Sequence, residues 1–117
     1  MVEDPQIYQL AYRLFLEEVP GLLETIEREL LDLENNSERA LKVNNLMRAV
    51  HTIKGGAANV QLEVIEGIAH RLEDVLRGLY SPDLTIDSSL KSLLFDSYEY
   101  LELLLSAKVE NTNINER

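Results

Sequence analysis

Apolar residues recur at steps of three and four along most of this chain, the spacing that places them on one face of an α-helix. The first such stretch covers residues 6–33, where Pro20 interrupts the pattern. Proline has no N–H and its ring clashes with the preceding turn, so we predict an amphipathic helix that is kinked or broken at residues 19–21. The apolar positions of this helix are Ile7, Leu10, Tyr12, Leu14, Phe15, Val19, Leu22, Leu23, Ile26, Leu30 and Leu33.

A polar linker at residues 34–37 separates this helix from a second one, which we predict over residues 38–60. Its apolar stripe follows steps of four and three, the seam of a helix packed in a bundle. His51 falls well off that stripe, so we expect its imidazole to be at least partly exposed. The stripe consists of Leu46, Val50, Ile53, Ala57 and Val60.

Two further helices follow, the third from Leu62 to just before residues 81–83 and the fourth from about residues 86–88. The third presents Leu62, Ile65, Ile68, Ala69, Leu72, Leu76 and Leu79, and the fourth Leu90, Leu93, Leu94, Tyr98, Leu101, Leu104 and Leu105. The short link between the second and third helices makes them antiparallel. We therefore predict an all-α, up-down-up-down antiparallel four-helix bundle over residues 1–109, followed by a polar tail or linker at residues 110–117.

Composition narrows the possible partners. The 117 residues include 11 basic and 21 acidic side chains, a net charge of 11 − 21 = −10, which repels the phosphate backbone of nucleic acids. Cysteine is absent, which excludes disulfides and thiolate sites. No apolar run reaches the roughly 20 residues that a membrane span needs, and the first residues lack the pattern of a signal peptide. We expect a cytoplasmic domain that binds no nucleic acid and does not insert into a membrane.

The candidate chemistry lies on the second helix, where His51, Lys54, Gly55 and Ala58 have offsets 0, 3, 4 and 7 and share one face. Gly55 and Gly56 stand inside the predicted helix, where each glycine costs about 1 kcal/mol relative to alanine. We interpret these two glycines, together with Ala58, as clearance that lets a partner protein approach beside His51.

A second polar face lies on the third helix and consists of Glu66, His70, Glu73 and Arg77. The antiparallel packing brings this face near Lys54. We expect Glu73 to accept a hydrogen bond from Nδ1–H of His51, which leaves Nε2 as the nucleophile. Lys54 could then offset the charge on a transferred phosphoryl group. We interpret Glu66 and Arg77 as ordinary solvated charges.

These residues resemble a known family. The segment HTIKGGA at residues 51–57, followed by HRLED at residues 70–74, is similar to the signature of histidine-containing phosphotransfer (HPt) domains in chemotaxis-type histidine kinases. The resemblance extends to FLEEVPGLLETIERELLDL in the first helix and covers about residues 7–105. It implies that His51 is the phosphoacceptor, that Lys54 is its neighbouring cation, and that His70 and Glu73 support the imidazole.

The resemblance also implies a function. Domains of this family receive a phosphoryl group from the ATP-binding domain of a histidine kinase and pass it to an aspartate of a response regulator receiver domain. They catalyse nothing alone and bind no cofactor, since the kinase domain holds ATP and the receiver holds Mg²⁺. We expect a monomer in isolation and possible membership of a larger kinase. One departure is Gln61, where the family often has glycine, so a different cap geometry is expected there.

Two other interpretations stay open. The domain could be an HPt-like bundle used only for docking or dimerisation, although the intact motif around His51 argues against that. A metal-binding bundle would need Glu-x-x-His motifs on two helices. The sequence offers only Glu66 and Glu73 around His70, without a matching set on the first or fourth helix.

Overall fold

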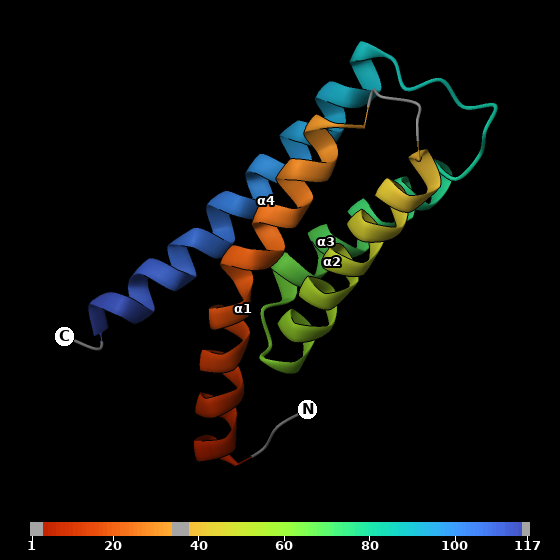
Figure 1. Cartoon of the computed structure of the whole chain (residues 1–117). Helices are drawn as coiled ribbons and strands as arrows, with labels where there is room; N and C mark the ends of the chain where they lie inside the picture. Colours follow the sequence, from red (N-terminus) through yellow and green to blue (C-terminus); the bar gives the residue numbers. More distant parts are fainter. Residues whose placement is uncertain (1–3, 34–37, 116–117) are drawn as a thin grey trace.

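The computed structural model describes residues 4–33 and 38–115, and within these ranges the regular secondary structure is entirely helical. The four helices are α1 (Pro5–Leu31), α2 (Arg39–Asn59), α3 (Glu63–Gly78) and α4 (Ser88–Asn115). Each helix packs against its two neighbours in the order α1, α2, α3, α4 and back to α1 (Figure 1). The predicted all-α bundle is confirmed, whereas the linker predicted at residues 34–37 lies outside the described residues.

Helix α1 begins at a side-chain cap and contains a proline in its interior. The carboxylate of Asp4 accepts from the backbone N–H groups of Gln6 and Ile7, at 2.8 and 3.3 Å. The helix continues through Pro20, which has no N–H to donate to the carbonyl one turn earlier. Figure 1 shows that the two halves of α1 point in different directions. The sequence pattern therefore predicted a kink correctly, and the helix is not broken.

The core lies along the predicted apolar stripes of α2 and α3. All five stripe residues of α2 are at most 1% exposed, so the seam is confirmed. On α3, the buried apolar residues are Ile65, Ala69, Leu72 and Leu76, and Leu79 is buried directly after the helix. These two stripes face each other and fix the side of α2 on which His51 stands.

Four residues that we placed on apolar stripes are exposed instead. Ile7, Leu10 and Leu14 of α1 and Leu93 of α4 are between 50% and 57% exposed. At 100° per residue, the three α1 residues fall on a different side of that helix from the buried Phe15. Periodicity groups residues on a face, but it does not show which part of the face a neighbouring helix covers.

The turn from α2 into α3 has glutamine at a position where glycine is usual. Gln61 has a φ of 62°, in the left-handed region. The Leu62 N–H donates to the carbonyl of Ala57 at 2.8 Å, and the Gln61 N–H donates to that of Ala58 at 3.3 Å. These two bonds define a Schellman motif, the usual end of a helix before glycine. The different cap geometry expected for Gln61 is therefore wrong, and the motif forms with a strained glutamine.

Helix α4 is longer than the sequence pattern indicated. It begins after Asp87, whose carboxylate accepts from the Leu90 N–H at 2.9 Å, and it ends at Asn115. Residues 110–115, which we interpreted as tail or linker, thus continue the helix. Backbone hydrogen bonds extend a helix without an apolar face, which is why periodicity placed its end too early.

Candidate functional site

His51 stands on the outer side of α2, away from the seam that packs into the core. Its side chain is 70% exposed, whereas Val50 and Ile53 beside it are fully buried. The predicted exposure of the imidazole is therefore confirmed.

Glu73 of α3 holds one side of the imidazole. Its side chain is buried, and its Oε2 lies 2.9 Å from Nδ1 of His51. A hydrogen bond from Lys54, assisted by the one from His51, lowers the pKa of Glu73 to about 2 against the opposing effect of burial. An ionised carboxylate can only accept, so Nδ1 carries the proton. In the neutral ring the lone pair is then on Nε2, on the side of the ring away from Nδ1. The expected position of Glu73 is confirmed.

Lys54 binds the other oxygen of the same carboxylate. Its Nζ lies 2.8 Å from Oε1 of Glu73, and its side chain is 22% exposed. The ammonium group has three N–H bonds, so two stay available beside the one directed at Glu73. The structure thus brings Lys54 and His51 together through Glu73. The role of Lys54 toward a phosphoryl group stays a prediction.

The two glycines beside His51 have different surroundings. A Cβ added to Gly55 would meet no atom within 4 Å, so this position is open to a partner. A Cβ added to Gly56 would lie 2.5 Å from Cε1 of Phe15 and closer still to its Cδ1. Gly56 therefore permits the close packing of α1 against α2, and its interpretation as clearance for a partner is wrong. Ala58 is half-buried on the same side as Gly55.

His70 does not join this network. Its Nε2 lies 3.7 Å from Oδ2 of Asp74, and both side chains are more than half exposed. Among the described residues, the other cation at the Glu73 carboxylate is Arg77, with Nη2 at 3.4 Å from Oε1 and Nη1 at 3.0 Å from Oδ1 of Asp74. The interpretation of Arg77 as an ordinary solvated charge is therefore incomplete, because its exposed guanidinium also contacts Glu73. Its i, i+4 spacing from Glu73 was the signal in the sequence.

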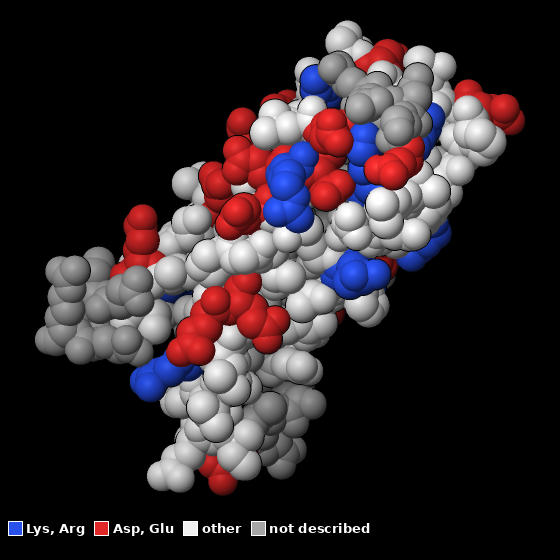
Figure 2. Space-filling model, in the orientation of Figure 1, with Lys and Arg blue, Asp and Glu red and all other residues white. Residues whose placement is uncertain are grey.

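Two shallow hollows lie near the site, and one of them borders it. Between α1 and α2 a hollow of about 320 Å³ includes Thr52, the residue after His51, together with Arg28 and Arg48. Its other lining residues are Leu22, Thr25, Asn45 and Ala49. Polar groups line much of this hollow. Figure 2 shows acidic side chains spread over α1 and α4, with basic ones between them.

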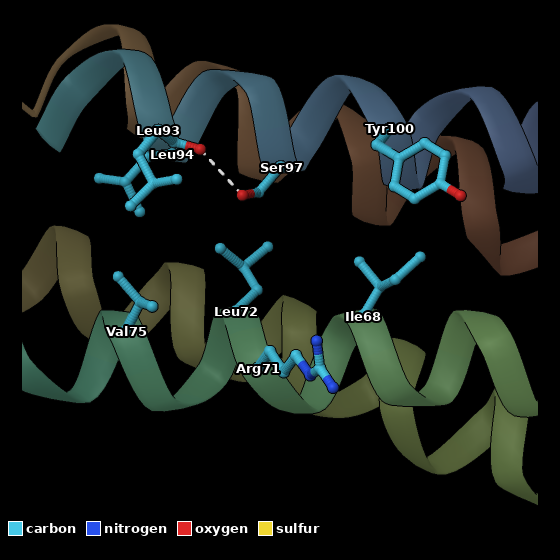
Figure 3. Close-up of a pocket in the computed structure, with 8 residues that line it drawn as sticks. All are labelled: Ile68, Arg71, Leu72, Val75, Leu93, Leu94, Ser97 and Tyr100. Atoms are coloured by element: carbon cyan, nitrogen blue, oxygen red, sulfur yellow. Dashed lines mark hydrogen bonds between the residues drawn. The ribbon is translucent and has the colours of Figure 1, made fainter. Parts of the chain in front are cut away.

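The second hollow, of about 270 Å³, lies between α3 and α4 and is mostly apolar. Ile68, Leu72 and Val75 of α3 point toward Leu93, Leu94 and Tyr100 of α4, and Arg71 stands at the edge (Figure 3). The side chains bonded to Glu73 are those of His51, Lys54 and Arg77, and none of them lines this hollow, which therefore lies outside the site. Among the described residues, no group of three or more His, Asp or Glu side chains could hold a metal ion, and no helix could span a membrane.

Comparisons with known proteins agree with this geometry. A family model described as the Hpt domain matches residues 11–108. The chemotaxis protein CheA of Treponema pallidum is 32% identical over 94 residues, which are 80% of this chain and 12% of that protein. The sensor histidine kinase CheAY of Helicobacter pylori is 29% identical over 91 residues, 78% of this chain and 11% of that protein. The chain thus spans only about a ninth to an eighth of these curated relatives.

A solved structure is also similar. It is the phosphorylated P1 domain of CheA3 in complex with CheY6 from R. sphaeroides, at 26% sequence identity and a TM-score of 0.75. The match covers 87% of this chain and 80% of that chain. At this level of identity and coverage, the four helices of the two domains have the same arrangement.

Proposed function

The chain belongs to the Hpt domain family, and from this membership we propose that it carries phosphoryl groups in two-component signalling, with His51 as the acceptor. The observation that carries the proposal is the exposed imidazole whose Nδ1 is bonded to the buried, ionised Glu73. The donor is the ATP-binding domain of a histidine kinase, and the acceptor is an aspartate of a response regulator receiver domain. The solved relative, a phosphorylated domain bound to CheY6, supports the second partner.

The first step loads His51. The lone pair on Nε2 attacks the γ-phosphorus of ATP held by the kinase domain, the N–P bond forms, and the bond between the γ-phosphorus and the bridging oxygen breaks as ADP leaves. The ring keeps its proton on Nδ1 and becomes cationic. The Glu73 carboxylate, 2.9 Å from Nδ1, stabilises that charge without any proton transfer.

The second step unloads His51. A carboxylate oxygen of the receiver aspartate attacks phosphorus, the N–P bond breaks, and the electron pair returns to Nε2. The proton stays on Nδ1 throughout, so the imidazole is ready for another cycle. Lys54 supplies a cation from this chain beside the phosphoryl oxygens, and a Mg²⁺ ion on the receiver would offset further charge there. The domain itself positions the group and needs no cofactor.

The surface around His51 suits a macromolecular partner. Gly55 lies one turn after His51 on the same face of α2, and the space where its side chain would be is open to solvent. The hollow between α1 and α2 continues this face and carries Arg28 and Arg48. A partner protein can therefore approach His51 over Gly55 without meeting a side chain at that position. With a net charge of −10, copies of the isolated domain repel each other, which supports a monomer.

Labelling with a kinase domain and radioactive ATP tests the proposal. The chain has two histidines, so His70→Gln is a matched control for His51→Gln. We expect label on the wild type and on the His70→Gln variant, and none on His51→Gln. A docking bundle without phosphotransfer would show no label on any of the three. Equal labelling of wild type and His51→Gln would show that another residue accepts the group.

A further inference from the structure

Two cations share one oxygen of the carboxylate that orients His51. Oε1 of Glu73 lies 2.8 Å from Nζ of Lys54 and 3.4 Å from Nη2 of Arg77. The first distance is a full charge-assisted hydrogen bond and the second is a weak one. Lys54 is therefore the main partner of Oε1 in the unphosphorylated domain, and Arg77 lies close enough to the same oxygen to replace it.

The two cations differ in what else they can reach. Lys54 shares a face of α2 with His51, one turn away, so its flexible ammonium lies near the place where a phosphoryl group on Nε2 would be. Arg77 is on α3 with Glu73 and is anchored there by Asp74 at 3.0 Å. The guanidinium group thus stays with α3 whichever way Lys54 turns.

A phosphoryl group brings up to about two negative charges next to His51. These charges attract the Lys54 ammonium away from Glu73, which is then left buried beside a new anion. Apart from the weak contact of Arg77, Glu73 then keeps only its bond from Nδ1–H at 2.9 Å, and a carboxylate that has lost a cation competes more strongly for that proton. Another cation has to replace Lys54 for the imidazole to keep its orientation and its proton.

We propose that Arg77 is a positioning residue that takes over Glu73 when Lys54 turns toward the phosphoryl group on His51. The guanidinium closes the 3.4 Å gap to Oε1 and keeps Glu73 ionised and bonded to Nδ1–H. The cationic ring is the better leaving group when the receiver attacks phosphorus. Arg77 thus acts on the outgoing transfer more than on the incoming one. This inference rests on the proposed phosphotransfer function.

The experiment compares wild type with Arg77→Ala, Arg77→Lys and the control Arg71→Ala. Arg71 is also an arginine of α3, so its removal changes the net charge by the same amount. It lies at the edge of the hollow toward α4, away from Glu73. The rates of loading from a kinase domain with ATP and of transfer to a receiver with Mg²⁺ are measured for each. We expect the ratio of outgoing to incoming rate to fall about fivefold in Arg77→Ala, the equivalent of one hydrogen bond. Arg77→Lys should restore part of the lost ratio, and Arg71→Ala should keep the wild-type ratio.

Proton NMR of the phosphorylated domain gives a readout that a merely structural role would not change. The Nδ1–H resonance of His51 should be visible in wild type and in Arg71→Ala, and should be broadened by exchange with water in Arg77→Ala. An unchanged ratio and resonance in a normally labelled Arg77→Ala variant would overturn this inference alone. Absence of label from wild type would overturn the proposed function, and the inference with it.

Discussion

Replacing either of the two adjacent glycines of α2 by alanine should change the stability of the domain in opposite directions. Replacing glycine by alanine inside a helix stabilises it by about 1 kcal/mol. At Gly55 the new methyl group meets nothing within 4 Å, so Gly55→Ala should gain that amount. At Gly56 the methyl group would lie 2.5 Å from Cε1 of Phe15. Phe15 is buried in the core and cannot move without disturbing its neighbours. Such overpacking costs about 1–3 kcal/mol, which outweighs the gain.

Gly56→Ala should therefore lose about 1 kcal/mol, which separates the two variants by about 2 kcal/mol. Urea unfolding followed by circular dichroism measures the free energy of unfolding of wild type and both variants, with the slope checked for constancy. Combining Gly56→Ala with Phe15→Leu, which removes the ring, should recover stability relative to Phe15→Leu alone. Equal stabilisation by the two alanines would refute the conclusion that Gly56 exists for the contact between α1 and α2.

Three other outcomes follow from the structure. Gln61→Gly should raise the free energy of unfolding by about 1 kcal/mol, because glycine adopts a left-handed φ without strain, whereas Gln61→Ala should not. The pKa of Glu73 is about 2 in the folded domain, against 4.5 for a free glutamate. Its ionisation should therefore contribute up to about 3 kcal/mol to the free energy of unfolding above pH 4.5, and this contribution should be lost as the pH falls through 2. In Glu73→Gln that part of the pH dependence of urea unfolding should disappear, and an unchanged pH profile would count against the Glu73 assignment. Gly55→Leu should keep the fold but slow transfer to the receiver, and an unchanged rate would show that partners do not approach over Gly55.

Much of the fold followed from periodicity because a bundle core is a repeating feature of the sequence. The stripe of α2 from Leu46 to Val60 was predicted residue by residue, and all of it is buried. Leu14 and Leu93 fit the same spacing and are exposed, since burial also depends on where the neighbouring helix lies. The end of α4 was placed too early because its last turns are polar.

Some features of the site could also be predicted from the sequence, and others could not. The pairing of His51 with Glu73 could be predicted because a short antiparallel link fixes which residues of α2 and α3 meet. The difference between Gly55 and Gly56 could not, because it depends on the position of the Phe15 ring on another helix. The contact of Arg77 with Glu73 depends on side-chain rotamers, for which the i, i+4 spacing is necessary but not sufficient.

The central claim is that Glu73 fixes the proton on Nδ1 and makes Nε2 of His51 the nucleophile. Phosphorus and nitrogen NMR of the domain, labelled with ¹⁵N at histidine and phosphorylated by a kinase domain with ATP, identifies the nitrogen that is bonded to phosphorus. The account predicts a coupling between phosphorus and Nε2 of His51, with the proton still on Nδ1. A phosphoryl group on Nδ1, or on any residue other than His51, would contradict it.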